Sequence, residues 1–239
     1  MSTQLPDDFL LTVVMPVFNE ERTLGAIVDA VLAEPTPKEL VLVDDGSSDR
    51  SRELLQELAQ REGVRVRLHE RNLGKGAALR TGFEAARGDV VVVQDADLEY
   101  DPQDYGVLLA PILSGDADVV YGSRYLVDPD DPGRARDAFG HYLGNRFLTF
   151  ASNLATGLNL TDMETCYKCF RREVLAPIRI RSRRFTVEPE LTAKIARSGA
   201  RVWETPIRYR GRAFADGKKI GWRDAVAALW AIARYRFAD

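Results

Sequence analysis

The chain has 239 residues, of which 45% are hydrophobic and 29% charged, and its formal net charge is −3. This size and composition predict one large globular domain, or at most two small ones, and exclude an intrinsically disordered chain. The longest strongly apolar stretch near a terminus covers only residues 225–233, whereas a membrane-spanning helix needs roughly 20 apolar residues.

The charge is uneven along the chain, with a balance of −13 over residues 1–170 and +10 over residues 171–239. The basic C-terminal third favours an anionic partner, either a phosphate-bearing ligand or a membrane surface. We expect no nucleic-acid partner, because the basic part lacks alternating aromatic residues. The acidic N-terminus has no apolar run typical of a signal peptide, so we expect a cytoplasmic protein.

The first half of the chain alternates between β-branched runs and helical patterns. We expect strands at 11–17, 39–43, 64–69, 89–93 and 118–121, and helices at 20–33, 51–61, 75–86 and 102–113, the second helix capped by Ser47 or Ser48. This alternation predicts an α/β fold with a doubly wound, mostly parallel sheet. Such sheets bind their ligands at the carboxyl ends of the strands.

The second half is less regular. We expect loops at 126–137 and 211–221, helices at 138–156 and 189–197, and a late strand at 201–207, which Pro206 places at a sheet edge. We expect Cys166 and Cys169 to be ordinary, partly buried side chains, since no second cysteine pair accompanies them.

The C-terminal residues 220–239 form a predicted amphipathic helix that follows a domain of residues 1–219. Trp222, Trp230 and Phe237 recur at helical spacing, with arginines nearby. Such a helix suits a membrane interface, and it equally suits packing on the preceding domain.

An acidic motif, Asp95-Ala96-Asp97-Leu98-Glu99, directly follows the strand predicted at 89–93. Alternate carboxylates just past a strand end offer hard oxygen ligands, which suit Mg²⁺ or Mn²⁺ held together with substrate phosphates. The plain alternative is a solvated acidic turn.

A second motif, Asn72-Leu-Gly-Lys-Gly76, opens the helix predicted at 75–86. Two glycines allow close backbone approach, and Lys75 adds a positive charge at a helix N-terminus that favours anions. The alternative is a loop-to-helix turn with a solvated lysine. The motif matches neither the P-loop nor the dinucleotide-binding pattern.

Five motifs occur in order along the chain: 16–21 (PVFNEE), 43–49 (VDDGSSD), 72–76 (NLGKG), 95–97 (DAD) and 122–124 (GSR). Together they resemble the family 2 glycosyltransferases of the GT-A fold, and among these the dolichyl- and polyprenyl-phosphate hexose synthases. The resemblance covers roughly residues 10–220 and implies a single domain with this fold and the use of a nucleotide-sugar.

The resemblance also implies roles for individual residues. It implies a metal site for Mg²⁺ or Mn²⁺ at Asp95, Asp97 and Glu99, with Asp97 among the catalytic residues. The residues that it implies at the nucleotide are Pro16, Phe18, Glu20, Asp44, Asp45, Lys75, Asp95 and Ala96.

Acceptor residues follow from the same resemblance. Arg124 matches an arginine near the acceptor phosphate and counts among the catalytic residues, and Arg210, Arg212, Lys218 and Lys219 resemble a basic loop that closes over phosphates. Glu188, with Glu190 second, falls where members acting on hydroxyl acceptors place a catalytic base. The segment 162–170 (DMETCYKCF) departs from the D-x-x-S-G-F pattern of the synthases.

The function that the resemblance implies is inverting transfer of a hexose, from UDP-hexose or GDP-mannose, to a polyprenyl phosphate at the cytoplasmic membrane face. An ionised phosphate acceptor needs no general base. Transfer to a sugar hydroxyl, with Glu188 as base, is the alternative within the family. A catalytically retired nucleotide-sugar-binding scaffold is the alternative outside enzymes.

Overall fold

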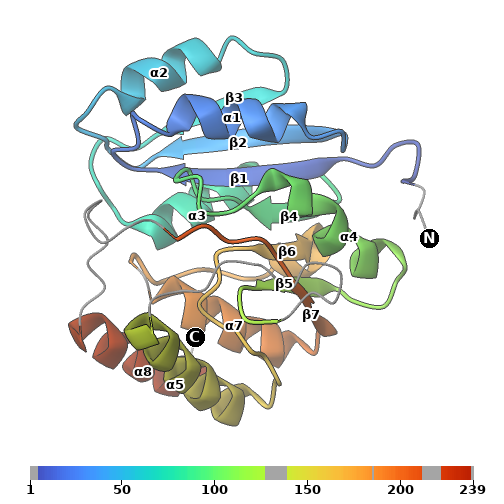
Figure 1. The fold of residues 1–239 in the computed structure, drawn as a ribbon, viewed down its shortest axis with the longest axis vertical. Helices are drawn as coiled ribbons and strands as arrows, with labels where there is room; N and C mark the ends of the chain where they lie inside the picture. Colours follow the sequence, from blue (N-terminus) through green and yellow to red (C-terminus); the bar gives the residue numbers. More distant parts are fainter. Residues whose placement is uncertain (1–4, 127–138, 185, 212–221, 238–239) are drawn as a thin grey trace.

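The computed structural model describes residues 5–126, 139–184, 186–211 and 222–237. In these ranges seven strands form one sheet in the order β3-β2-β1-β4-β6-β5-β7 (Figure 1). Neighbouring strands are parallel except at β6, which runs antiparallel to β4 and β5. The predicted α/β fold with a mostly parallel sheet is confirmed. The strands are β1 (Leu11–Val17), β2 (Lys38–Asp44), β3 (Val64–Leu68), β4 (Val90–Val93), β5 (Val119–Ser123), β6 (Lys168–Arg171) and β7 (Val202–Pro206).

The centre of the sheet is apolar on both faces. All four valines of β4 are buried, and β1 lies between β4 and β2. Continuous β-branched runs of this kind are expected where helices cover both faces of a sheet. The late strand β7 lies at one edge of the sheet, as Pro206 predicted.

Helices connect the strands and cover the sheet. Helix α3 packs on β1 and β2, helix α4 packs on β5 and β6, and α5, α7 and α8 pack against one another in the lower part of Figure 1. The helices are α1 (Leu24–Ala33), α2 (Ser51–Leu58), α3 (Lys75–Ala85), α4 (Tyr105–Leu113), α5 (Phe139–Thr156), α6 (Arg172–Leu175), α7 (Val187–Ser198) and α8 (Trp222–Phe237), with a 3-10 turn, η1 (Pro102–Asp104), before α4.

Two details at the start of the chain differ from the prediction. The first helix begins at Leu24, because residues 20–23 form a turn in which the Thr23 amide donates to the Glu20 carbonyl. The expected cap of α2 by Ser47 or Ser48 is wrong. Both serines instead bond to Asn19 in the loop after β1.

The last helix packs against the rest of the described chain. In α8 the Tyr235 hydroxyl lies 3.3 Å from the Ser182 hydroxyl, and Arg236 donates to the carbonyls of Leu154 and Ala155 in α5. The division into a domain of residues 1–219 and a helix at 220–239 stays a prediction. None of the helices in the described residues combines the length and the apolar character that a membrane crossing requires.

Candidate functional site

The polar motifs of the sequence lie along the edge of the sheet that is formed by the carboxyl ends of the parallel strands. The parallel strands β1, β2, β4 and β5 all end there, and in Figure 1 the arrowheads of β1 and β2 point to the same side. Because β6 is reversed, its first residue, Lys168, and the preceding loop of residues 161–167 lie at this same edge, between the ends of β4 and β5. We call this edge, with its loops, the strand-end site.

The loops after β1 and β2 are tied together. The amide of Asn19 donates to the Ser47 hydroxyl at 3.1 Å, and the amide of Glu20 donates to the Ser51 hydroxyl at 2.9 Å. Asn19 has a positive φ of 57°, a conformation that asparagine tolerates better than most residues. Of the residues predicted to line a nucleotide pocket, Pro16 lies in β1 and Phe18 is exposed at the strand end.

The two acids at the end of β2, Asp44 and Asp45, are buried and bonded within the chain. Asp44 accepts from the Arg52 guanidinium at 3.0 Å. Asp45 accepts from the amides of Leu73 and Gly74 and lies 2.8 Å from the His69 ring. Both side chains are therefore placed at the predicted site, where Asp45 anchors the loop that leads into α3.

The glycines before and in α3 make their close contact with another segment of the chain, whereas the sequence suggested an anion at this helix N-terminus. A Cβ on Gly74 would lie 1.9 Å from the Arg183 carbonyl oxygen, and one on Gly76 would lie 2.1 Å from that of Ser182. The Gly76 amide also donates to the Arg183 carbonyl at 3.0 Å. The close backbone approach that these glycines permit is thus to the 182–183 segment of the chain.

Lys75, between the two glycines, points to the acidic motif. Its ammonium group lies 2.9 Å from the Asp95 carboxylate and 3.6 Å from that of Glu188. Burial is the largest single influence and lowers the pKa of Lys75, but the negative charges of Asp95 and Glu188 and the hydrogen bond to Asp95 together contribute to raising that pKa well above its usual value. The solvated-lysine alternative is therefore wrong.

The acidic motif after β4 contains backbone strain. Leu98, between Asp97 and Glu99, has a φ of 62°, which costs roughly 1–3 kcal/mol in a residue other than glycine and is typical of functional sites. Glu99 is buried and accepts from the Tyr209 hydroxyl at 2.7 Å.

The predicted metal ligands are only partly brought together. Within the described ranges no three aspartate, glutamate, histidine or cysteine side chains cluster as they would around a metal ion, so Asp95, Asp97 and Glu99 do not form a ready-made triad. Asp95 and Asp97 still offer the carboxylate oxygens that Mg²⁺ and Mn²⁺ prefer when substrate phosphates supply other ligands. Ala96 between them is buried.

Arg124 follows β5 and forms a buried ion pair with Asp162. Two guanidinium nitrogens donate to the two oxygens of this carboxylate at 2.7 and 2.8 Å, and Asn145 of α5 donates to it as well. Burial is the largest single influence and lowers the pKa of Arg124, but the charge of Asp162 and its hydrogen bonds, acting with the neighbouring groups, raise that pKa well above its usual value. The guanidinium also stacks 5.1 Å from the ring centre of Tyr209.

A second buried pair joins Glu188, at the start of α7, to Lys168 of β6. Glu190 does not lie in the same network. It accepts from the amides of Arg181 and Ser182 and pairs with Lys194 at 2.8 Å, so it holds the loop before α7 rather than facing a substrate, which makes it an unsuitable second candidate for a catalytic base.

The Glu164 carboxyl, in the loop of residues 161–167, stands apart from these pairs. Its Oε1 atom is buried and accepts no hydrogen bond from the residues that the structure describes. Burial, and next the negative charge of Glu188, raise the pKa of Glu164 to about 7, against the opposing charges of Lys168 and Arg124. A carboxyl group with this pKa exchanges its proton near neutral pH.

The basic loop is described only at its start. Arg210 is exposed, and its amide donates to the Glu99 carbonyl at 2.9 Å. Arg212, Lys218 and Lys219 lie outside the described residues, as does most of the predicted loop at 126–137.

Sequence reasoning missed several residues of this site, among them Lys168, Gln94 and His69. Lys168 is 1% exposed, and a lysine inside an otherwise apolar run was a signal that a buried acid would face it. Gln94, directly before the acidic motif, accepts from the hydroxyls of Tyr105 and Tyr167. His69 had no signal in the sequence. The two cysteines are buried and free, as expected of ordinary side chains.

Comparison with known proteins gives the strand-end site a context. The sequence model of the family described as "Glycosyl transferase family 2" matches residues 12–179. The chain is 31% identical over 215 residues to an undecaprenyl-phosphate 4-deoxy-4-formamido-L-arabinose transferase of Aeromonas hydrophila, covering 87% of this chain and 62% of that protein. It is 28% identical to a dodecaprenyl-phosphate galacturonate synthase of Rhizobium johnstonii, covering 84% of this chain and 59% of that protein. The chain thus spans about three fifths of the length of these relatives.

Solved structures agree on the fold. A glucosyl-3-phosphoglycerate synthase of Mycobacterium tuberculosis, crystallised with Mn²⁺, UDP-glucose and phosphoglyceric acid, superposes with a TM-score of 0.72 at 21% identity, covering 97% of this chain and 81% of that one. At this identity the likeness shows a common fold.

Proposed function

This chain belongs to glycosyl transferase family 2, and from that premise we propose that it transfers a sugar from a nucleotide-diphospho-sugar to the phosphate of a polyprenyl lipid. The two relatives described above carry polyprenyl-phosphate acceptors in their names, which supports this acceptor class. We further propose that transfer inverts the anomeric carbon and takes place at the inner face of the cytoplasmic membrane.

One observation carries the proposal: the order of charged groups along the strand-end site. The acids at the end of β2 come first, Lys75 and the acidic motif lie at the end of β4, and Arg124 lies at the end of β5. A donor lying along this edge has its nucleoside near β1 and β2, its diphosphate near Asp95 and its sugar directed towards Arg124. An acceptor phosphate at Arg124 then faces the sugar.

The leaving diphosphate gains negative charge as the sugar departs. Lys75 is the residue of this chain that we place beside it, because its ammonium group already lies 2.9 Å from Asp95. A divalent cation held by Asp95 and Asp97 would add further stabilisation of that charge. The Mn²⁺ in the structural neighbour's crystal supports this assignment.

An acceptor phosphate is already ionised, so the chain has to position it and needs no base. The Arg124 guanidinium is suited to this, since its planar fork binds phosphate oxygens in pairs. Glu188, the base of the alternative with a hydroxyl acceptor, lies 6% exposed between the ammonium groups of Lys168 and Lys75. Because this carboxylate is buried and held by two ammonium groups, an acceptor hydroxyl has little access to it, which favours the phosphate acceptor.

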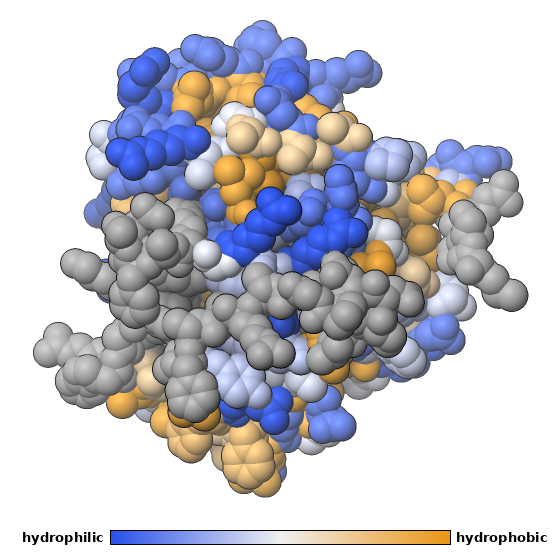
Figure 2. Space-filling model, viewed as in Figure 1, coloured by the Kyte–Doolittle hydropathy of each residue, from blue (hydrophilic) through white to orange (hydrophobic). Residues whose placement is uncertain are grey.

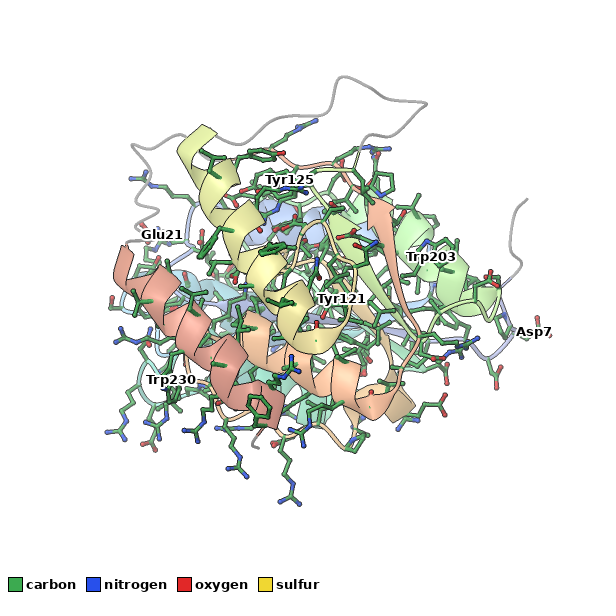
Figure 3. All side chains as sticks on the ribbon, turned by 90° about the horizontal axis from the view of Figure 1, so that it is seen from below. Asp7, Glu21, Tyr121, Tyr125, Trp203 and Trp230 are labelled. Atoms are coloured by element: carbon green, nitrogen blue, oxygen red, sulfur yellow. The ribbon has the colours of Figure 1, made fainter. Side chains whose placement is uncertain are left out.

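A membrane-bound acceptor calls for a surface that meets the bilayer, and we propose α5 together with α8. On α5, apolar side chains repeat every three or four residues and are 52–74% exposed, and α8 packs beside this helix (Figure 3). Orange side chains gather at the lower edge of the molecule in Figure 2, where Figure 1 places these helices. The apolar face consists of Leu143, Phe147, Phe150 and Leu154 of α5 with Val226, Trp230 and Phe237 of α8.

The charges around this face suit an anionic lipid surface. Arg234 lies over the Trp230 ring at 5.0 Å and Arg236 over the Phe237 ring at 5.2 Å. Aromatic and basic residues on one helix face are typical of helices that lie in the plane of a membrane interface, and each basic residue near an anionic leaflet contributes about 1 kcal/mol.

The proposed activity is tested with short-chain polyprenyl phosphate, Mg²⁺ or Mn²⁺, and UDP-glucose, UDP-galacturonate or GDP-mannose. We expect lipid-dependent release of one nucleoside diphosphate and a glycolipid of matching mass. The Asp97→Ala variant should be inactive. The Asp116→Ala variant should be fully active, because Asp116 is an exposed acid at the opposite end of the strands. Transfer to a sugar hydroxyl alone would contradict the acceptor. Nucleotide binding without any transfer would favour the scaffold.

The membrane face is tested by sedimentation with vesicles of phosphatidylcholine, with and without phosphatidylglycerol. We expect the chain to bind the anionic vesicles, and Phe150→Asp to reduce that binding strongly. Val107→Asp is the matched control, because Val107 is an exposed apolar residue of α4, a helix outside the proposed face. Equal binding of both variants would contradict the proposal.

A further inference from the structure

The loop of residues 161–167 occupies a central place in the strand-end site. It leads into β6, which lies between β4 and β5 in the sheet. The start of the loop is anchored, because Glu204 of β7 accepts from the amides of Thr161 and Asp162 at 2.8–2.9 Å. The loop therefore lies between the acidic motif after β4 and Arg124 after β5.

Glu164 is the acid of this loop whose charge is not balanced within the site. The charged groups that face it are Arg124 after β5, Asp162 in its own loop, Lys168 of β6 and Glu188 of α7. These four form two pairs, Arg124 with Asp162 and Lys168 with Glu188. Within the described part of the chain, the Oε1 atom of Glu164 accepts no hydrogen bond.

A buried acceptor without a donor costs free energy in the folded protein, commonly about 1–3 kcal/mol. The neighbouring Thr165 hydroxyl is likewise buried without a partner. Two unsatisfied oxygens on consecutive residues of this loop indicate a place where a ligand supplies missing hydrogen-bond donors.

The strand order indicates which part of the ligand reaches this loop. Adjacent strands are about 4.8 Å apart, so the end of β6 lies roughly 10 Å from the end of β1. In the proposed function the nucleoside lies near β1 and β2 and the diphosphate near β4, so the next strand, β6, meets the sugar.

We propose that Glu164 binds the transferred sugar by accepting hydrogen bonds from its hydroxyl groups, and so helps to select the donor. This inference rests on the proposed function. The chemistry of the ligand supports it, because both phosphate groups of the reaction are anions that a carboxylate repels, whereas sugar hydroxyls are donors that it attracts. A sugar that presents a carboxylate to this position would be disfavoured.

The test compares the affinity of a nucleotide-sugar with that of its nucleoside diphosphate, by calorimetry on the full chain with Mg²⁺. The probes are UDP-glucose with UDP and GDP-mannose with GDP. The variants are Glu164→Gln and Glu164→Ala, with Glu84→Gln as the matched control, because Glu84 is exposed near the far end of α3. Measuring the ratio of the two affinities separates contacts to the sugar from contacts to the nucleotide.

We expect Glu164→Ala to weaken the binding of the nucleotide-sugar about tenfold or more relative to the binding of the nucleoside diphosphate, because a hydrogen bond to a charged group is lost. Glu164→Gln, which keeps the shape, should lose part of this preference and should not melt at a lower temperature than the unaltered chain. Between pH 6 and 8 the ratio should rise more steeply in the unaltered chain than in Glu164→Gln, because the carboxylate accepts more strongly than the neutral acid.

Three results would overturn the inference. Equal weakening of nucleotide-sugar and nucleoside diphosphate would show that Glu164 does not contact the sugar. A marked drop in the melting temperature of Glu164→Gln would show a structural role instead. If the unaltered chain binds no nucleotide, the proposed function fails and this inference fails with it, whereas the first two results leave the proposed function intact.

Discussion

Replacing Glu164 by glutamine should stabilise the folded chain, and increasingly so as the pH rises. The side chain lies in a loop where burial and the charge of Glu188 oppose its ionisation. Glutamine keeps its size and carries no charge, so the variant removes this cost. Functional sites commonly contain such locally unfavourable groups, and replacing them raises stability while lowering activity.

The magnitude follows from the two pKa values of this carboxyl group, 4.5 as the ordinary value and about 7 in the folded chain. Below the lower value both states hold the proton, and the group does not affect the free energy of unfolding. As the pH rises towards 7 the unfolded chain ionises first, so the folded state loses stability. A difference of about 2.5 pH units at 1.36 kcal/mol each amounts to at most about 3 kcal/mol, complete near pH 8.

The assay is urea unfolding at several pH values between 5 and 8, followed by tryptophan fluorescence. Relative to the unaltered chain, Glu164→Gln should gain stability steadily over this range, while Glu84→Gln should run parallel to the unaltered chain. Parallel curves for Glu164→Gln as well would refute the argument that this carboxyl group is forced to keep its proton on folding.

Three further predictions concern the rest of the strand-end site. Asp97→Ala should abolish sugar transfer, measured as release of nucleoside diphosphate, with an unchanged circular dichroism spectrum. Asp162→Ala leaves the buried Arg124 guanidinium without its carboxylate and should cost about 3–5 kcal/mol in urea unfolding; a loss below 1 kcal/mol would contradict the buried pair. Gly76→Ala places a Cβ 2.1 Å from the Ser182 carbonyl oxygen, so we expect a clearly lower melting temperature, and an unchanged one would contradict this close packing.

The sequence alone predicted the fold well because its signals are local. Short β-branched runs alternate with helical patterns, and each predicted strand of the first half lies within two residues of its observed bounds. The edge position of β7 followed from Pro206, which cannot donate a hydrogen bond to a neighbouring strand. Motifs directly after strands could be assigned to one edge of the sheet, since parallel strands end together.

The reversal of β6 could not be predicted in the same way. The direction of a strand depends on long-range pairing, here with β4 and β5, and a four-residue strand has no pattern that encodes it. This reversal brings Lys168 and the loop of residues 161–167 to the strand ends. Because the sequence does not reveal this reversal, it could not reveal that Lys168 pairs with Glu188 or that Asp162 pairs with Arg124.

The glycines around Lys75 show a different limit. Two glycines beside a lysine at a helix start correctly indicated close backbone contact. The sequence could not say what makes that contact, and the structure shows the carbonyls of Ser182 and Arg183. A glycine indicates that another part of the molecule approaches closely. Only the tertiary structure shows which residue that is.

Under the proposed function, the charged groups of the site account for the binding of two anionic substrates. In this structure Lys75 pairs with Asp95, and Arg124 pairs with Asp162. Under the proposed function each phosphate accepts hydrogen bonds from one of these two cations. A carboxylate that then shares its cation with a phosphate is able to bind a second cation. At Asp95 that second cation would be a divalent metal ion, which would offset negative charge on the diphosphate, and an acid that is about one fifth exposed is accessible enough to hold it. At Asp162, which is fully buried and bonded to Asn145 as well, no such exchange is open, so this carboxylate keeps Arg124 in position while the outer side of the guanidinium meets the acceptor.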